Sequence, residues 1–178
     1  MQVFELGILD WIQLHCRCAA MDTLMPAVSR ICNHGGVWIL LAAVLLLHKK
    51  TRRSGMVLAV ALLLDVLVCN VALKPLIGRI RPCDVNLSVR LLIHRPGDCS
   101  FPSGHAASSF AAVGALRASG CRLWIPALVL ALFICFSRLY LYVHWPSDVL
   151  GGIVLGLALG LLAQWLVRLL ERRTPELK

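Results

Sequence analysis

Long apolar runs dominate this 178-residue chain and decide the solvent in which it can fold. Hydrophobic residues make up 59% of the sequence, and its mean hydropathy of +0.80 is too high for a soluble globular domain. The runs lie at residues 35–47, 56–73, 104–116, 123–136 and 149–170. A lipid bilayer is therefore expected to surround most of the chain.

Several of these runs are shorter than the roughly 20 residues that a helix needs to cross hydrocarbon, so flanking residues or local thinning of the bilayer must complete them. We predict an all-α fold, a multi-pass transmembrane helical bundle with five spans. Before these spans, Phe4, Ile8, Trp11 and Ile12 recur at helical spacing, although charged and titratable residues interrupt the segment. This N-terminal helical element is expected to lie in the membrane interface or to form a sixth span. No basic segment precedes an apolar core, so no cleaved signal peptide is expected.

The distribution of the net charge of +9 favours a membrane topology over nucleic-acid binding. If the five spans alternate, three basic clusters fall on one side of the bilayer, which the positive-inside rule makes cytoplasmic together with the C-terminus. The clusters are Lys49, Lys50, Arg52 and Arg53; Arg117 and Arg122; and Arg168, Arg172, Arg173 and Lys178. Other basic residues lie on the opposite side, where an anionic ligand is their simplest explanation: Lys74, Arg79, Arg81, Arg90, Arg95 and Arg138.

Three short polar segments, called the islands below, fall at the non-cytoplasmic ends of the predicted helices: residues 74–82, 102–105 and 137–148. Ionisable groups near a bilayer mark a functional site by default, because their desolvation is costly. Together the islands provide two imidazoles, one carboxylate and the cations Lys74, Arg79, Arg81 and Arg138. This is a set of groups suited to breaking a phosphate ester.

The second island, Pro102-Ser103-Gly104-His105, begins a helix that is rich in small residues. The N-terminus of a helix receives phosphate oxygens through its free amides and its dipole. Gly104 leaves room for an anion, Ser103 offers a hydroxyl hydrogen bond, and His105 lies near the same anion. The alternative is a serine N-cap followed by an interfacial histidine.

In the third island, His144 and Asp148 are four residues apart at the start of a helix that Pro146 favours. A carboxylate that accepts from one ring nitrogen leaves the other nitrogen unprotonated and nucleophilic. Arg138 adds planar, bidentate recognition of phosphate oxygens. Without Arg138, an acidic residue that balances the helix dipole would explain Asp148 and leave the histidine incidental.

In the first island, Lys74 closes an apolar helix and Arg81-Pro82 opens the following loop. Snorkelling of the lysine competes with ligand binding as an explanation of Lys74 alone. It does not explain Arg81, which is in a loop on the side that the positive-inside rule disfavours. Arg79 fits no spacing that we can justify and is expected to be a secondary contact.

Together the islands resemble the signature of the type 2 phosphatidic acid phosphatase family, also called the acid phosphatase and vanadium haloperoxidase superfamily. The signature reads Lys-x6-Arg-Pro, Pro-Ser-Gly-His and Ser-Arg-x5-His-x3-Asp. Every fixed position is filled here, by Lys74, Arg81, Pro82, Pro102, Ser103, Gly104, His105, Ser137, Arg138, His144 and Asp148. The resemblance implies a lipid phosphate or diphosphate phosphatase that works without metal or other cofactor, through a phosphohistidine. The charge distribution predicts that it acts at the non-cytoplasmic face of the cell membrane.

The resemblance also implies a role for each residue. His144 would be the nucleophile, Asp148 its orienting partner, and His105 the acid that protonates the leaving oxygen. The phosphoryl oxygens would be bound by Lys74, Arg81, Ser103, Gly104 and Arg138. We expect one domain, with an N-terminal helical or interfacial segment at 1–34, a catalytic transmembrane bundle at 35–170 and a cytoplasmic tail at 171–178.

The resemblance leaves the substrate and two other functions open. Undecaprenyl diphosphate, phosphatidylglycerol phosphate and phosphatidate are all candidates, because compact bacterial members act on such lipids. A lipid phosphotransferase could use the same phosphohistidine with an acceptor other than water. A non-catalytic lipid-phosphate transporter or binding protein is the third possibility, but no catalytic residue is lost, which favours an enzyme. The soluble haloperoxidase branch is disfavoured because the chain has no hydrophilic shell.

Three further patterns predict packing. Cys83 and Cys99 flank the loop between two islands, and we hypothesise a disulfide there.

Small residues at four-residue spacing would let two helices approach closely, unless they form only generic packing faces. These residues are Ala107, Ala111 and Ala115 on one helix, and Gly152, Gly156 and Gly160 on the other. Asp65 and Asn70, inside an apolar run, are expected to hydrogen-bond neighbouring helices, and a role in conducting substrate is the alternative.

Overall fold

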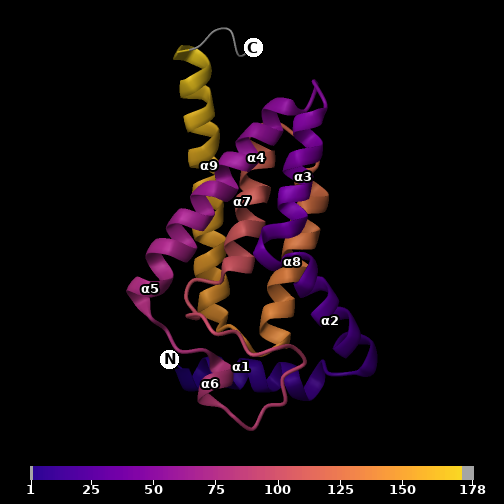
Figure 1. Ribbon diagram of the computed structural model, residues 1–178. Helices are drawn as coiled ribbons and strands as arrows, with labels where there is room; N and C mark the ends of the chain where they lie inside the picture. Colours follow the sequence, from indigo (N-terminus) through magenta and orange to yellow (C-terminus); the bar gives the residue numbers. More distant parts are fainter. Residues whose placement is uncertain (1, 174–178) are drawn as a thin grey trace.

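The computed structural model describes residues 2–173, and every regular element in that part of the chain is helical (Figure 1). The π-helix η2 continues α4 into α5. The elements in chain order are α1 (Gln2–His15), α2 (Ala19–Ile31), η1 (Asn33–Gly35), α3 (Gly36–Leu47), α4 (Arg52–Asp65), η2 (Val66–Leu73), α5 (Lys74–Ile77), α6 (Pro82–Val85), α7 (Gly104–Ala118), α8 (Trp124–Tyr140) and α9 (Pro146–Arg173).

The helices α3, α4, α7, α8 and α9 form an elongated bundle, and α1 lies across the end of it where α8 ends and α9 begins (Figure 1). This arrangement confirms the predicted all-α bundle. By length and composition, two helical stretches among the described residues can cross a membrane: Arg52–Val85, of 34 residues, and α9, of 28 residues. A third requires that α2 and the helix from Asn33 to Leu47, bent by 48°, count as one span. The count of five spans stays a prediction.

The contact between α7 and α9 is the most extensive between any two helices in the described chain. It depends on glycine, because a Cβ on Gly156 would lie 2.3 Å from the carbonyl oxygen of Ala107 and 2.7 Å from the amide nitrogen of Ala111. Gly160 faces Ala115 in the same way, with the added Cβ 2.6 Å from its amide nitrogen. The predicted pairing of the two small faces is therefore confirmed.

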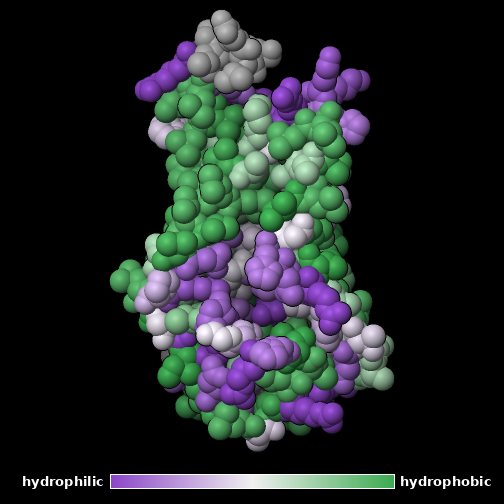
Figure 2. Space-filling model, viewed as in Figure 1, coloured by the Kyte–Doolittle hydropathy of each residue, from purple (hydrophilic) through white to green (hydrophobic). Residues whose placement is uncertain are grey.

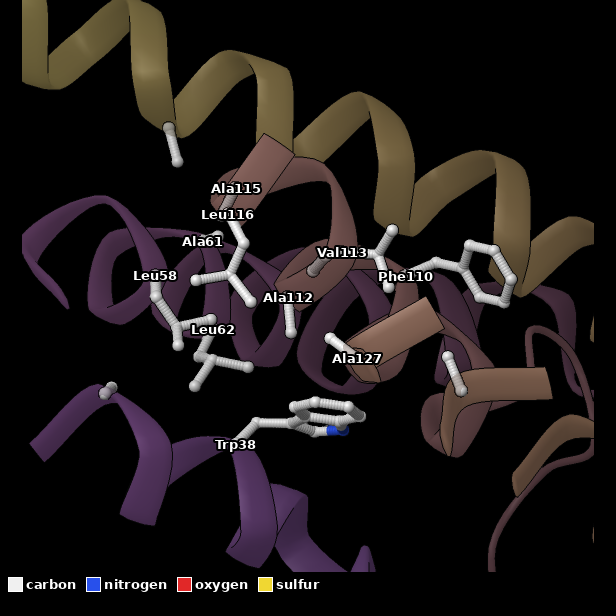
Figure 3. Close-up of a cluster of buried hydrophobic side chains, with 14 of the residues drawn as sticks. Trp38, Leu58, Ala61, Leu62, Phe110, Ala112, Val113, Ala115, Leu116 and Ala127 are labelled. Carbon is white, nitrogen blue, oxygen red and sulfur yellow. The ribbon is translucent and has the colours of Figure 1, made fainter. Parts of the chain in front are cut away.

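A second packing interface joins α3 and α4 to α7 and α8 through one cluster of buried apolar side chains. Figure 3 shows the indole of Trp38, from α3, turned toward Ala112 and Ala127. The ring nitrogen of Trp38 donates a hydrogen bond of 3.1 Å to the hydroxyl of Ser109 on α7, which satisfies the polar end of a side chain that is only 1% exposed. This cluster fixes the bundle around α7.

The outer surface of the bundle is apolar along its middle and polar toward both ends (Figure 2). At one end, Arg53 at the start of α4 donates to Glu171 near the end of α9, with 2.9 Å between the two charged groups. This is the end that carries the basic clusters. The islands lie at the opposite end, near α1 and the loop from 86 to 103 (Figure 1).

Three predicted details differ from the structure. Pro82 begins the short helix α6 instead of a loop, since its fixed φ suits the first helical position. The helix α9 continues to Arg173, so the predicted tail from 171 is still helical at its start, and 174–178 lie outside the described residues. Cys83 and Cys99 are free thiols, and Cys83 packs instead among the buried apolar side chains next to Tyr142 and Trp145.

Replacing Gly156 by Ala should destabilise the protein, because the new Cβ meets backbone atoms of α7 that cannot rotate away. We expect a cost of about 1–3 kcal/mol, typical of overpacking a tight contact, measured as a lower thermal unfolding midpoint in detergent. Gly7→Ala is the matched control, since nothing lies within 4 Å of the added Cβ. Equal midpoints for Gly156→Ala and the wild type would contradict the inferred contact.

Candidate active site

A cavity of about 1220 Å³ lies at the end of the bundle that carries the islands. Figure 2 shows hydrophilic residues gathered over this end of the molecule. Two of the predicted site residues, Ser103 and Asp148, are completely buried at the starts of α7 and α9. Their backbones are joined, because the amide of Ser103 donates to the carbonyl oxygen of Asp148 at 3.1 Å. The other six line the cavity: Lys74, Arg81, Gly104, His105, Arg138 and His144.

His144 lies between α8 and α9 and is 1% exposed. Its Nε2 is 3.2 Å from a guanidinium nitrogen of Arg81, while its Nδ1 is 3.4 Å from Oδ2 of Asp148. The predicted proximity of the histidine and the carboxylate is therefore confirmed. The predicted hydrogen bond between them is not formed, since Nδ1 has no partner with hydrogen-bond geometry in the described structure.

The carboxylate of Asp148 is occupied by other donors. Its Oδ2 accepts from the hydroxyl of Ser100 and, at 2.9 Å, from the backbone amide of Trp145. Its Oδ1 accepts from Arg79 at 2.6 Å. Asp148 is thus held beside His144 by three donors, with 3.4 Å between Nδ1 and Oδ2.

The surroundings of His144 keep its imidazole neutral. Burial lowers the pKa of His144 well below its usual 6.5, and the positive charges of Arg81, Arg138 and Lys74 lower it further, while Asp98 opposes them. A neutral imidazole has a free lone pair on one nitrogen at neutral pH. The ring is therefore in the protonation state that a nucleophile requires.

Two of the predicted phosphate-binding cations share one carboxylate, that of Asp98. Arg81 donates from Nη2 to Oδ1 of Asp98 at 2.7 Å, and the ammonium group of Lys74 contacts the other oxygen. Burial raises the pKa of Asp98, but Lys74 and Arg81 outweigh that effect and lower it to about 2. An anion thus lies between the two cations. Arg81 is further fixed by its bond of 2.6 Å to the carbonyl oxygen of Val143.

Two buried hydrogen-bond donors at the site have no acceptor in the described structure: the Nε of Arg138 and the hydroxyl of Ser103. Such groups are rare in folded proteins and indicate a missing partner, which a bound ligand can supply. Ser103 stands at the N-cap of α7, yet its side chain makes no capping hydrogen bond. The simple N-cap explanation of Ser103 is therefore not supported, and its hydroxyl is free to bind an anion.

His105 and Gly104 form the first turn of α7. The Nε2 of His105 is 3.1 Å from Oδ1 of Asn33 in η1, which fixes the orientation of the ring. A Cβ on Gly104 would lie 3.2 Å from Oδ1 of Asn70 and 3.6 Å from the ammonium nitrogen of Lys74, so the glycine lets this turn of α7 approach both side chains. That Gly104 leaves room for an anion stays a prediction.

Asp65 and Asn70 also line the cavity. The Oδ1 of Asp65 is buried and has no hydrogen-bond partner among the described residues, so the predicted interhelical bond is not made by this atom.

Sequence reasoning missed the contribution of the N-terminal segment. Ser29 on α2 accepts a hydrogen bond from Arg138, and Asn33 contacts His105, so residues before 35 belong to the site. Neither residue lies in a signature motif. Asp98 also lies outside the signature motifs and was not predicted. Its position in a loop that carries Arg90 and Arg95 could have indicated a carboxylate that pairs with a cation.

Comparison with known families matches residues 54–172 to the PAP2 superfamily. This chain is a member of the PAP2 superfamily. The matched region contains all eight predicted site residues.

Related proteins and solved structures agree with membership of the PAP2 superfamily. The chain is 36% identical to an undecaprenyl-diphosphatase from Sulfolobus acidocaldarius over 139 residues, which cover 78% of this chain and 66% of that protein. The fold is similar to Aquifex aeolicus LpxE, with a TM-score of 0.75, 25% identity and coverage of 89% of this chain and 93% of that chain.

A second solved structure is a transmembrane PAP2 type phosphatidylglycerolphosphate phosphatase from Bacillus subtilis, with a TM-score of 0.70 and 26% identity. That alignment covers 97% of this chain and 86% of the other. The sequence alignments with three curated relatives cover 66%, 60% and 43% of the length of those proteins. The chain therefore spans about two thirds or less of each of them.

The titration of His144 can be measured without substrate. Because burial and three cations disfavour the imidazolium, His144 should remain neutral to a pH well below 6.5. NMR of the protein labelled at its histidine rings, in detergent, should show that the His144 resonances do not change between about pH 8 and pH 6. His144→Gln assigns that resonance. A His144 resonance that titrates near pH 6.5 would disprove the inferred electrostatics.

Proposed function

We propose that this PAP2 protein is a phosphatase for lipid phosphates or diphosphates, and that it forms a phosphohistidine intermediate without a metal ion. The observation that carries the proposal is the position of His144, a buried neutral imidazole that lines a cavity together with Lys74, Arg81 and Arg138. These cations would bind a phosphoryl group and stabilise the charge that its oxygens carry in the transition state.

The direction of attack follows from the ring of His144. Its Nδ1 faces Asp148 and its Nε2 faces Arg81, so Nε2 is the atom that would attack phosphorus. As the bond from Nε2 to phosphorus forms, the bond from phosphorus to the lipid oxygen breaks. His105 would donate a proton to that oxygen, which leaves as an alcohol or, from a diphosphate, as a lipid phosphate.

Water completes the reaction in a second step. His105, now neutral, would take a proton from a water molecule as its oxygen attacks the phosphohistidine. The bond between phosphorus and Nε2 then breaks, inorganic phosphate leaves, and both imidazoles return to their starting states. Arg81, Arg138 and Lys74 would act in both steps, because the same oxygens carry the charge each time.

A lipid substrate is supported by the walls of the same cavity. Apolar side chains of Ile39, Leu62 and Val66 line it together with the charged groups, so a hydrocarbon tail can lie beside the phosphate site. The basic end of the bundle lies opposite to the site, which supports a site at the non-cytoplasmic face of the cell membrane and a cytoplasmic C-terminus.

Undecaprenyl diphosphate is the first substrate to test, because a relative with 36% identity carries the name undecaprenyl-diphosphatase. Phosphatidylglycerol phosphate and phosphatidate follow. The purified protein in detergent should release phosphate from at least one of the three lipids in the presence of EDTA. A strict requirement for added Mg²⁺ would contradict the mechanism, and no release from any lipid would contradict the phosphatase function.

Substitutions in the site should lower the rate of the reaction. His144→Ala should abolish both turnover and the labelled phosphoenzyme, because the atom that bonds to phosphorus is gone. Arg138→Gln should lower kcat/KM by about 10²-fold or more, the usual cost of losing one preorganised donor to the transition state. Arg117→Gln is the matched control, since Arg117 lies at the opposite end of the bundle against Trp124. Near-normal activity of His144→Ala would disprove its assignment as nucleophile.

A further inference from the structure

Arg79 lies outside the cavity lining and connects three elements of the protein. Its Nη1 donates to Oδ1 of Asp148 and to the hydroxyl of Ser147, both at 2.6 Å. Its Nη2 donates to Oε2 of Glu5 on α1 at 2.8 Å. The guanidinium also lies over the ring of Trp145, 5.2 Å from the ring centre. Arg79, a residue of the first island, thus binds the first turn of α9.

Glu5 completes this connection from the other side. Its Oε1 accepts from the backbone amide of Ser147, in the first turn of α9, at 2.9 Å. Glu5 is 4% exposed, and although burial raises the pKa of its carboxyl, the hydrogen bonds from Ser147 and Arg79 lower it to below its usual value. Glu5 is therefore an anion at neutral pH. It compensates the charge of Arg79 and also the positive end of α9.

We propose that Arg79 and Glu5 are positioning residues for the catalytic pair of His144 and Asp148. The chain of contacts runs from Glu5 to Arg79, from Arg79 to Asp148, and from Asp148 to His144. This inference rests on the function proposed above, and it gives the N-terminal helix α1 a part in the reaction although α1 lies outside the matched family region.

The physical need for such a pair comes from the burial of Asp148. A completely buried carboxylate is costly unless hydrogen bonds and an opposite charge compensate it. Ser100 and the amide of Trp145 are neutral donors to Oδ2, so Arg79 is the cation that bonds the carboxylate directly. By occupying Oδ1, Arg79 also fixes the plane of the carboxylate, which leaves Oδ2 as the oxygen closest to His144.

Glu5 in turn determines where Arg79 can bind. Without Glu5, the guanidinium would keep its contact with Asp148 but lose the anchor on its second amino group. With only Nη1 bound, the guanidinium could turn about its contact with Asp148, since the Arg79 side chain is 20% exposed. The pair should thus be needed for the rate of the chemical step, while phosphate binding by Lys74, Arg81 and Arg138 should not depend on it.

A purely structural role would be different, because α1 has other anchors. Asp10 accepts from the hydroxyl of Tyr142 at 2.7 Å, and the amide of Gln13 donates to the carbonyl oxygen of Tyr140 at 2.7 Å. If Glu5 only held α1 in place, removing the Asp10 contact would have the same effect as removing Glu5. Asp10→Asn is therefore the matched control for Glu5→Gln: both change one carboxylate on the same helix to its amide.

The experiment measures kcat, KM and the thermal unfolding midpoint of the full chain in detergent, with the lipid that the wild type hydrolyses fastest. Arg79→Gln should lower kcat by about 10- to 100-fold, in the range found when partners that orient an active group are lost, and should change KM little. Arg79→Lys should retain more activity than Arg79→Gln, because it keeps the charge. Glu5→Gln should lower kcat in the same direction by a smaller factor.

The double variant Glu5→Gln, Arg79→Gln should be no slower than Arg79→Gln alone, because both residues act through one chain of contacts. Asp10→Asn should retain the kcat of the wild type. An unchanged kcat in Arg79→Gln, or an equal loss in Asp10→Asn, would overturn the proposal. Should Arg79→Gln fail to fold, Glu5→Gln against Asp10→Asn decides. An inactive wild type would refute the proposed function instead, which distinguishes the two failures.

Discussion

The close approach of α7 and α9 is the constraint on which the site depends. His105 and Ser103 are at the start of α7, and His144 and Asp148 are at the start of α9, so the spacing of these helices sets the distance between the two halves of the site. Glycines on α9 allow backbone to touch backbone, with Gly156 against Ala107. In a bilayer, where apolar side chains gain little from leaving lipid, such close contact is a main source of helix association.

The second constraint is that the buried cations of the site must be compensated. Arg81 and Arg138 are almost completely buried, and a buried cation requires a partner. The protein supplies carbonyl oxygens, the hydroxyl of Ser29 and the carboxylate of Asp98, but it leaves one donor of Arg138 and the hydroxyl of Ser103 unpaired. The described side chains thus compensate much of the buried charge and leave donors for a ligand.

Much of this site could be predicted from sequence because its residues stand at fixed spacings. His144 and Asp148 are four residues apart and Lys74 and Arg81 are seven residues apart, so each pair is close in the sequence. The contacts of Glu5, Ser29 and Asn33 could not be predicted, since they depend on how α1 and α2 return to the bundle. The bond of Arg79 to Asp148 could not be predicted either, because it joins two islands and Arg79 stands outside the signature.

The fold was predicted less completely at its boundaries. Apolar runs marked the five helices of the bundle, and small residues marked which two would meet. Bends and helix ends follow weaker rules, so the short helix at Pro82 and the last turn of α9 were missed. The disulfide failed because proximity in sequence to the same loop does not align two Cβ atoms, and Cys83 gains more from apolar packing.

The carboxylate of Asp98 between Lys74 and Arg81 has a consequence for turnover. A phosphate group that binds there must share or replace an anion that is already present, so binding is an exchange of counter-ions. Because Asp98 is tethered by the chain, its effective concentration is high, and it can return as soon as the product begins to leave. Under the proposed function, the Asp98 carboxylate competes with the substrate and with inorganic phosphate alike, so it weakens the binding of both and favours release of the product.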